Sequence, residues 1–465
     1  MATTTHPQSR DARRRTARSV LLVAALLGLI CIACARGSYP SVGAVSPAAS
    51  ENDELDGRDE RQLPTNRPTV EGAFPRESYA PGDVARLVIW TGGRKVSLQV
   101  FRAGTEEKRM RARDVMLGTP VTTAREVGDV HKGRRISVPV GDWPSGLYFA
   151  KLVTRSGVRV GFAPFVLRPT RLGEHRVAVV MPTMTWQAYN FHDDDHNGSL
   201  DTWYAGQKHA RLGRPYENRG AIPHYKYYDE PFLRWLIATG RDVDYLADAD
   251  IDRSSTTGRA LARAYDLVVF PGHHEYVTTH EYDAITAYRN LGGNLMFLSA
   301  NNFFWRTVKA GNVMTRTNKW RDLGRPESAL IGVQYFGNDA GKHRGAWILR
   351  DAPAARWIFA GTGLGQGSRF ANAGIEADET TPSSPRGTQI LGAIPNLFGT
   401  GHDAQMTYYE TSKGAKVFAA GAFTLAGSVW WTDVQQLMEN LWARLANDHN
   451  HASRWTEARN QAAVK

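Results

Sequence analysis

The sequence predicts a β-sandwich followed by a doubly wound α/β sheet. The first part rests on short alternating apolar runs, broken by turn residues, between residues 72 and 169. The second part rests on strands that alternate with helices from about residue 177 to residue 445. At 465 residues and 42% hydrophobic residues, the chain is long enough for two domains, each with its own core.

The predicted sandwich covers residues 71–170 and resembles an immunoglobulin-like sandwich in its length of roughly 100 residues. Its alternating runs are residues 85–90, 96–101, 136–140, 147–153 and 158–166. Turn residues such as Pro81-Gly82 separate them. Tyr148 follows one of these turns and is typical of a buried tyrosine at a sandwich corner.

One β-α-β unit at residues 267–305 lies at the centre of the predicted α/β domain. Four apolar residues, 267–270, are stopped at once by a Pro-Gly pair, which indicates a short buried strand. An amphipathic run then leads to a Gly-Gly break and a second buried strand at 295–299. In an open parallel sheet, ligands bind at the carboxyl ends of the strands. That rim would carry His273, Glu275, Asn301 and Asn302.

The α/β domain as a whole is predicted over residues 171–450. Its other expected elements are strands at 177–181, 243–247 and 416–420 and helices at 231–239 and 434–445. Residues 307–414 are rich in glycine and weakly periodic. We expect loops and irregular strands there, lying over the rim of the sheet.

The N-terminal segment predicts export. Residues 1–35 combine an arginine-rich start with about 16 apolar residues, which suits a signal peptide better than a span of roughly 20. The expected location is therefore secreted or in the cell envelope. A lipoprotein acylated at Cys34 and an uncleaved membrane anchor are the alternatives. Residues 36–70 have the composition of a disordered linker, and residues 451–465 form a tail.

The net charge of +11 does not indicate a nucleic-acid partner. Part of the excess comes from the arginines of the N-terminal segment, and the rest is spread along the chain. No run of lysine and arginine of the kind that forms a nucleic-acid arm is present in the sequence. We therefore expect no nucleic acid among the partners.

Several catalytic classes are excluded by the residues themselves. Both cysteines, Cys31 and Cys34, lie in the N-terminal segment, so a thiol nucleophile is not expected in the α/β domain. That domain also lacks G-x-S-x-G and the glycine-rich phosphate loops. A carboxylate, histidines and several tyrosines remain, and this set of donors is typical of a site for a hard metal ion.

Five motifs, in order along the chain, resemble the C-terminal region of the large subunit of N,N-dimethylformamidase and its relatives. They are TWQAYN at residues 185–190, RPY at 214–216, FLRWL at 232–236, GHHEY at 272–276 and SANNFFW at 299–305. The similarity covers about residues 175–450. It implies a domain like that of class I glutamine amidotransferases, without their cysteine nucleophile.

The resemblance also implies a mononuclear iron held by two tyrosines and one glutamate. The glutamate corresponds to Glu275 and the first tyrosine to Tyr189. Tyr216 is the preferred second tyrosine, with Tyr204 and Tyr228 as alternatives. His273 would serve in acid/base chemistry, and Asn301 or Asn302 could orient a substrate carbonyl.

Two functions follow as hypotheses. The first is an exported, metal-dependent hydrolase of a small amide, with iron as the metal. The second is a non-catalytic exported binding or surface protein that retains the fold without the chemistry. Homo-oligomers and an N-terminal membrane anchor are compatible with both functions.

An acidic stretch after Tyr189 matches part of a calcium loop. Asp193, Asp195 and Asn197 occupy positions 1, 3 and 5 of a D-x-[DN]-x-[DN]-G pattern, and Asp201 occupies position 9. Position 12 holds a tyrosine where an EF-hand has glutamate. A calcium site that braces the loop beside Tyr189 and a solvated acidic turn are therefore both open. His192 and His196 could also form a different, softer metal site there.

Overall fold

The computed structural model describes residues 67–106, 109–339 and 342–446. The predicted signal peptide, most of the predicted linker and the predicted tail lie outside these residues. Among the helices that are described, none has both the length and the apolar character needed to cross a membrane.

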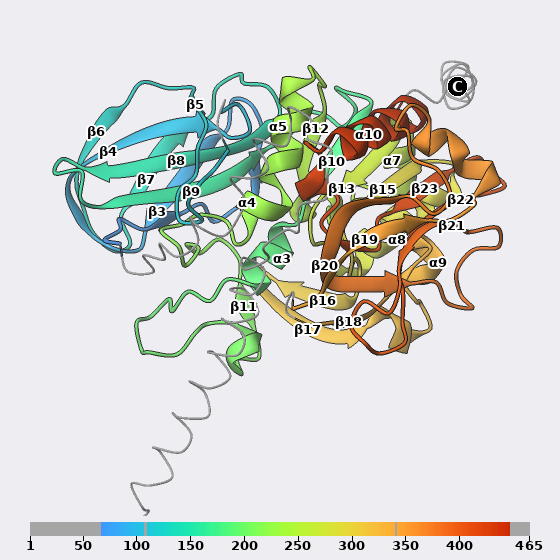
Figure 1. The fold of residues 1–465 in the computed structure, drawn as a ribbon. Coiled ribbons are helices and arrows are strands. Elements are labelled where there is room, and N and C mark those ends of the chain that lie inside the picture. Colours follow the sequence, from blue (N-terminus) through green and yellow to red (C-terminus); the bar gives the residue numbers. More distant parts are fainter. Residues whose placement is uncertain (1–66, 107–108, 340–341, 447–465) are drawn as a thin grey trace, which may run out of the picture.

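Residues 72–167 form two β-sheets that enclose one core (Figure 1). The smaller sheet has the order β1-β3-β7, and the larger has the order β2-β9-β8-β4-β5, with β6 paired to β4. The bounds are β1 Gly72–Ala73, β2 Ser78–Tyr79, β3 Val84–Ile89, β4 Gly93–Arg102, β5 Thr119–Pro120, β6 Arg125–Val130, β7 Arg135–Pro139, β8 Gly146–Thr154 and β9 Val160–Leu167. The longer strands lie where the alternating runs predict them. Tyr148 is fully buried and its hydroxyl donates to the Pro144 carbonyl over 2.7 Å, as a corner tyrosine does.

An 11-stranded mixed sheet dominates the rest of the molecule. Its order is β12-β10-β13-β15-β23-β22-β21-β19-β20-β18, with β24 paired to β20. The neighbours from β12 to β23 are parallel, and all pairs beyond β23 are antiparallel. The bounds are β10 Val177–Met181, β12 Asp244–Ala247, β13 Leu267–Phe270, β15 Asn294–Phe297, β18 Gln334–Asn338, β19 Arg344–Leu349, β20 Arg369–Glu379, β21 Gln389–Ile394, β22 Ala404–Glu410, β23 Lys416–Ala419 and β24 Ala422–Phe423.

A smaller four-stranded sheet and short helices complete this region. The small sheet has the order β11-β17-β16-β14, with β11 Ala210–Arg211, β14 Tyr276–Thr278, β16 Trp305–Ala310 and β17 Val313–Lys319. The helices are α3 Thr183–Ala188, α4 Tyr225–Tyr228, α5 Glu230–Ala238, α6 Asp248–Ile251, α7 Gly258–Ala264, α8 Thr279–Asn290, α9 Ser328–Ile331 and α10 Thr432–Leu445. Short 3₁₀ turns are η2 Trp203–Ala205, η3 Trp320–Leu323, η4 Pro353–Phe359 and η5 Ala426–Ser428.

The predicted fold class, a doubly wound α/β sheet like that of class I glutamine amidotransferases, is wrong. Strands make up 34% of the chain and helices 20%, and the large sheet is mixed. The error arises at residues 307–414, which supply most of the antiparallel strands. Register shifts interrupt β18/β20, β19/β20 and β21/β22, and glycines lie within several of these strands. The regular alternation that identifies strands in a sequence is therefore lost there.

The sandwich and the mixed sheet share a hydrophobic core. Phe149 of β8 and Phe162 of β9 belong to the same buried cluster as Val179 of β10 and Leu236 of α5. Figure 1 shows the blue-to-teal sandwich beside α5 and β12. The sandwich is thus packed against the region that carries the predicted site.

Candidate active site

The loop between β13 and β14 carries His273 and Glu275. It passes so close to the buried Asp229 that a Cβ at Gly272 would lie 2.3 Å from the carboxylate Oδ1. Only glycine fits there without displacing its neighbours. The Pro-Gly break seen in the sequence therefore ends the strand and also allows the loop to turn over Asp229.

Two sequence motifs hold this loop through hydrogen bonds. The hydroxyl of Thr185 in α3 accepts from the backbone N–H groups of Glu275, over 3.1 Å, and Tyr276, over 3.3 Å. The backbone N–H groups of Phe304 and Trp305 donate to the Glu275 carbonyl over 3.0 and 2.9 Å. The loop is thus fixed from both sides, which limits the positions open to the Glu275 side chain.

Tyr189 and Glu275 meet at the centre of the site. Tyr189 follows the C-terminus of α3, and its hydroxyl donates to Oε2 of Glu275 over 2.6 Å. The ring of Tyr204 stacks on that of Tyr189, with centroids 4.9 Å apart. The Tyr204 hydroxyl also contacts the hydroxyl of Tyr276. Three phenols and a carboxylate are therefore gathered in one cluster, in which Tyr276 and Glu275 are buried and Tyr189 and Tyr204 are half-buried.

His273 lies between two carboxylates. Its Nε2 is 3.3 Å from Oε2 of Glu275 and 3.2 Å from Oε2 of Glu376, on β20. The side-chain amide of Asn301 is 3.4 Å from the same nitrogen. Asn301 has a positive φ of 53° and its backbone N–H donates to Asp378 over 2.9 Å. This backbone conformation, which asparagine tolerates better than most residues, places its amide beside His273.

Burial dominates the electrostatics of the cluster. It raises the pKa of Glu275 to about 7, with His273 opposing the rise and Glu376 adding to it. Burial, followed by the charge of Glu275, raises the pKa of Tyr189 well above its ordinary value. Burial lowers the pKa of His273, but Glu376 and Glu275 outweigh it and the net shift is upward. With no cation bound, Tyr189 is therefore a neutral phenol near pH 7.

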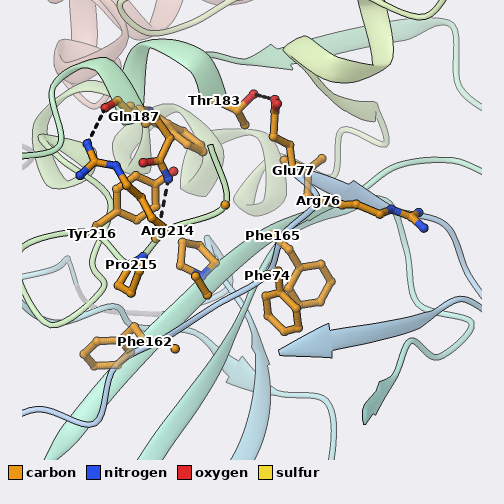
Figure 2. Close-up of a pocket in the computed structure, with 16 residues that line it drawn as sticks. Phe74, Arg76, Glu77, Phe162, Phe165, Thr183, Gln187, Arg214, Pro215 and Tyr216 are labelled. Atoms are coloured by element: carbon orange, nitrogen blue, oxygen red, sulfur yellow. Dashed lines mark hydrogen bonds between the residues drawn. The ribbon is translucent and has the colours of Figure 1, made fainter. Parts of the chain in front are cut away.

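The structure places Tyr216 in a different environment. Figure 2 shows it beside Pro215 and Arg214, in a cavity that also receives Glu77 from the sandwich. That cavity measures about 30 Å³, room for one or two water molecules, and neither His273 nor Glu275 lines it. Tyr228 packs on Phe423, whose ring lies 4.8 Å from His273. Of the three candidates for the second tyrosine, Tyr204 lies beside Tyr189.

The residues predicted on the rim have distinct positions. Asn301 lies beside His273, whereas the side chain of Asn302 accepts from the backbone N–H of His274 over 3.3 Å and so supports the loop. Sequence reasoning missed Glu376 and Asp378, because they lie in the segment at 307–414 where no strand could be assigned. Tyr276 was missed as a participant although it directly follows Glu275 in the GHHEY motif.

The acidic stretch after Tyr189 forms a compact loop. Ligand oxygens of Asp193, Asp195 and Asp201 lie within 4.8 Å of one another. Asp193 accepts from the backbone N–H groups of Asn197 and Gly198 over 3.2 and 2.8 Å. Backbone N–H groups of the loop therefore meet part of the hydrogen-bonding capacity of its carboxylates. The calcium site stays a prediction.

The donor set at the centre of the site fits a hard trivalent cation. Phenol and carboxylate oxygens are the hard ligands that such an ion prefers, and Tyr189, Tyr204 and Glu275 present them within one cluster. A cation would also replace the proton that now lies between Tyr189 and Glu275. Iron therefore suits this chemistry.

The profile of one protein family, described as N,N-dimethylformamidase beta subunit-like, C-terminal, matches residues 97–433. The chain belongs to this family. The match begins in β4, so the N,N-dimethylformamidase beta subunit-like region includes much of the sandwich and is longer than the resemblance at residues 175–450 indicated.

Two curated relatives have the name of the family. The N,N-dimethylformamidase beta subunit of Alcaligenes sp is 22% identical over 281 residues, covering 47% of this chain and 36% of the relative. That of Paracoccus aminophilus is 22% identical over 286 residues, covering 47% and 37%. The match thus spans just over a third of the length of these relatives.

A solved structure of Paenibacillus sp. cycloisomaltooligosaccharide glucanotransferase, complexed with cycloisomaltoheptaose, aligns with 76% of this chain and 69% of its own. The TM-score is 0.17 and the identity 8%. A similarity this weak carries no information about the fold of this chain. It gives no support to the predicted amidotransferase-like sheet either.

Proposed function

We propose that this chain hydrolyses the C–N bond of a small amide at the cluster of Tyr189, Glu275 and His273, with iron as its resident metal. The observation that carries the proposal is the 2.6 Å contact between the Tyr189 hydroxyl and the Glu275 carboxylate, beside the histidine. The names of the relatives make dimethylformamide the first substrate to test.

Tyr189, Tyr204 and Glu275 would hold the iron. A ferric ion bound there would lower the phenol pKa values far below about 10 and would polarise an amide carbonyl. The choice of Tyr204 over Tyr216 rests on its stacking against Tyr189.

His273 has the position for the proton transfers. It can accept a proton from the attacking water and then deliver it to the leaving nitrogen, so that one amide and one water give one carboxylic acid and one amine. Glu376, 3.2 Å from the same Nε2, favours the protonated imidazole between these steps. The amide of Asn301 can orient the substrate carbonyl.

The burial of the site argues for a small substrate. His273 is 7% exposed, Glu275 3% and Asn301 2%. A peptide or a polysaccharide could not reach these groups without a large opening of the loops around them. A molecule of a few heavy atoms is therefore the expected substrate class.

The test combines metal content with activity. Protein produced with iron available is expected to contain about one iron per chain, to show the visible absorption of tyrosinate bound to ferric iron, and to release amine from dimethylformamide or another small amide. Glu275→Ala should lose the iron, the colour and the activity together, because a hard anionic ligand is removed. Glu126→Ala, an exposed position on β6, is the matched control and should keep all three.

Iron-free, colourless wild-type protein that releases no amine would contradict the proposal. It would favour the alternative, an exported binding or surface protein without the chemistry. Tyrosinate-to-iron absorption retained in full by Glu275→Ala would contradict the assignment of the ligands, whatever the activity.

Export and assembly belong to the same proposal. We infer secretion or retention in the cell envelope from the N-terminal segment, and the mass of the mature chain separates cleavage near Ala35 from acylation at Cys34 or an intact anchor.

The word "subunit" in the names of the relatives suggests that this chain works in a complex, with copies of itself or with a second chain. Light scattering of the purified protein gives the number of copies.

A further inference from the structure

A second cluster of metal-ligating side chains lies behind the loop that carries Glu275. We propose that Asp248, His274 and Glu281 bind a divalent transition-metal ion that braces this loop. The three side chains come from three elements, namely the start of α6, the loop after β13 and the first turn of α8. The site is additional to the iron proposed at Glu275 and does not depend on it.

The geometry of the three ligand atoms fits a coordinated ion. Nε2 of His274 lies 2.6 Å from Oδ1 of Asp248 and 3.2 Å from Oε1 of Glu281. Ligands bound to one ion at about 2.1 Å are about 3.0 Å apart at adjacent octahedral corners and about 3.4 Å apart at tetrahedral ones. The 3.2 Å separation matches this range, and the 2.6 Å separation would lengthen when an ion binds. All three residues are completely buried, so no bulk solvent competes for them.

Hydrogen bonding accounts for only one of these two contacts. Nε2 of His274 is hydrogen-bonded to Oε1 of Glu281, whereas Oδ1 of Asp248 accepts no hydrogen bond among the described residues in spite of its 2.6 Å separation from Nε2. Oε2 of Glu281 also has no hydrogen-bond partner there. Buried polar atoms rarely lack partners. An ion at the centre would occupy the Nε2 lone pair and one oxygen of each carboxylate.

The charge around the cluster also favours a cation. Glu77 and Asp252 lie next to it, and Lys309 is shared between these two, with Nζ 3.8 Å from Glu77 and 3.4 Å from Asp252. Thr183 links the Glu77 and Asp248 carboxylates through its hydroxyl. Four carboxylates thus face one lysine and one histidine. Buried charges need compensation, and a divalent ion supplies it.

The donor set indicates the class of ion. One imidazole nitrogen with two carboxylate oxygens suits zinc, manganese or iron(II). Calcium is a poorer match, because it takes six to eight oxygen ligands. Two of the protein ligands are carboxylates, so the bound ion would leave the site close to neutral.

The expected role is to position the catalytic loop. His274 lies between His273 and Glu275 in sequence, and the second oxygen of Asp248 accepts from the backbone N–H of Met184, in α3, over 2.6 Å. The ion would therefore tie the loop to the helix that leads to Tyr189. It would touch neither substrate nor iron.

The test measures how many metal ions bind to protein in which the proposed iron site has been removed by Glu275→Ala. Glu275→Ala protein, stripped with a chelator, is expected to bind one equivalent of cobalt(II) with visible d–d absorption. The double variant Glu275→Ala/Glu281→Gln should bind it at least about 100-fold more weakly, since a ligand is lost. Asp283→Asn in the same background changes an exposed carboxylate on the same helix and should bind as before.

The result that overturns the proposal is equally direct. The proposal is wrong if Glu275→Ala protein binds no cobalt. It is also wrong if Glu281→Gln and Asp283→Asn, each made in the Glu275→Ala background, bind cobalt equally well. Should Glu281→Gln fail to fold, X-ray absorption of cobalt-loaded Glu275→Ala protein decides instead. One imidazole among oxygen ligands is expected, and a shell without an imidazole overturns the proposal. The bound cobalt is counted in protein that lacks Glu275. The count can therefore be interpreted even if the iron proposal fails.

Discussion

At the scale of single residues, the second tyrosine ligand is the sharpest open choice. We predict that Tyr204→Phe loses most of the tyrosinate-to-iron absorption and that Tyr216→Phe keeps it. Tyr204 stacks on Tyr189 and its hydroxyl reaches Tyr276, whereas Tyr216 lines another cavity. Removing one hydroxyl leaves the packing of either ring intact, so visible spectra and iron content report on ligation.

The two variants are controls for each other, because both tyrosines have a raised pKa caused by burial. Loss of colour in Tyr216→Phe with full colour in Tyr204→Phe would return Tyr216 to the metal. Loss in both would point to a general loosening of the fold, which a comparison of their melting temperatures detects.

The strand pattern of the sequence placed His273 and Glu275 on one rim, and the family resemblance added Tyr189. The structure brings the three side chains together. Glu376 could not be found in this way. It lies in β20, in which Ala371 and Ile375 have positive φ and the register shifts, so the local pattern gave no sign of a strand. Only long-range pairing places it at His273.

At the scale of elements, the acidic loop at residues 193–201 makes a separate prediction. Calcium should stabilise the protein by roughly 1–3 kcal/mol at concentrations well above its Kd. Asp195→Asn should remove most of this gain, because Asp195 offers one of the three clustered carboxylates. Thermal unfolding with calcium, magnesium or chelator measures it, with the exposed Asp242→Asn as the control. An equal response of both variants would mean that the loop is an acidic turn.

The burial pattern of each strand decided whether the sequence predicted it. β10, β13 and β23 are buried along their whole length and were predicted to within a residue, because continuous apolar runs bounded by turns are unambiguous. β18 has no fully buried residue, and β19 alternates poorly. Their positions depend on β20, which pairs with both. The sequence therefore predicted the parallel part of the sheet and missed its antiparallel half, and the fold class was wrong for that reason.

At the scale of the whole molecule, the sandwich and the mixed sheet form one structure. The family match starts inside the sandwich, and the shared core joins Phe149 and Phe162 to the sheet. One polar link reaches the site directly. Glu71, next to β1, accepts from His192 over 3.1 Å, and His192 lies three residues after Tyr189. Whatever weakens this link should loosen the loop beside the tyrosine.

That link predicts a dependence of stability on pH. His192 lies between Glu71 and Asp194; burial lowers its pKa, but hydrogen bonds to both carboxylates outweigh burial and raise it to about 9. Because the pKa is higher in the folded than in the unfolded protein, charged His192 stabilises the fold fully below about 6.5 and loses this effect as the pH rises through about 9. The shift in the pKa of His192 corresponds to roughly 3 kcal/mol.

We therefore expect His192→Gln to lower the free energy of unfolding by roughly 2 kcal/mol at pH 6 and by much less at pH 9.5. Urea unfolding of the wild-type and His192→Gln proteins at the two pH values measures the difference between their free energies of unfolding. Other titrating groups contribute equally to both proteins and cancel in this difference. A chelator in all samples removes any contribution from the acidic loop at 193–201. A difference that is the same at both pH values would mean that His192 is not held in its charged form by Glu71 and Asp194, and that the contact between sandwich and site rests on the apolar core alone.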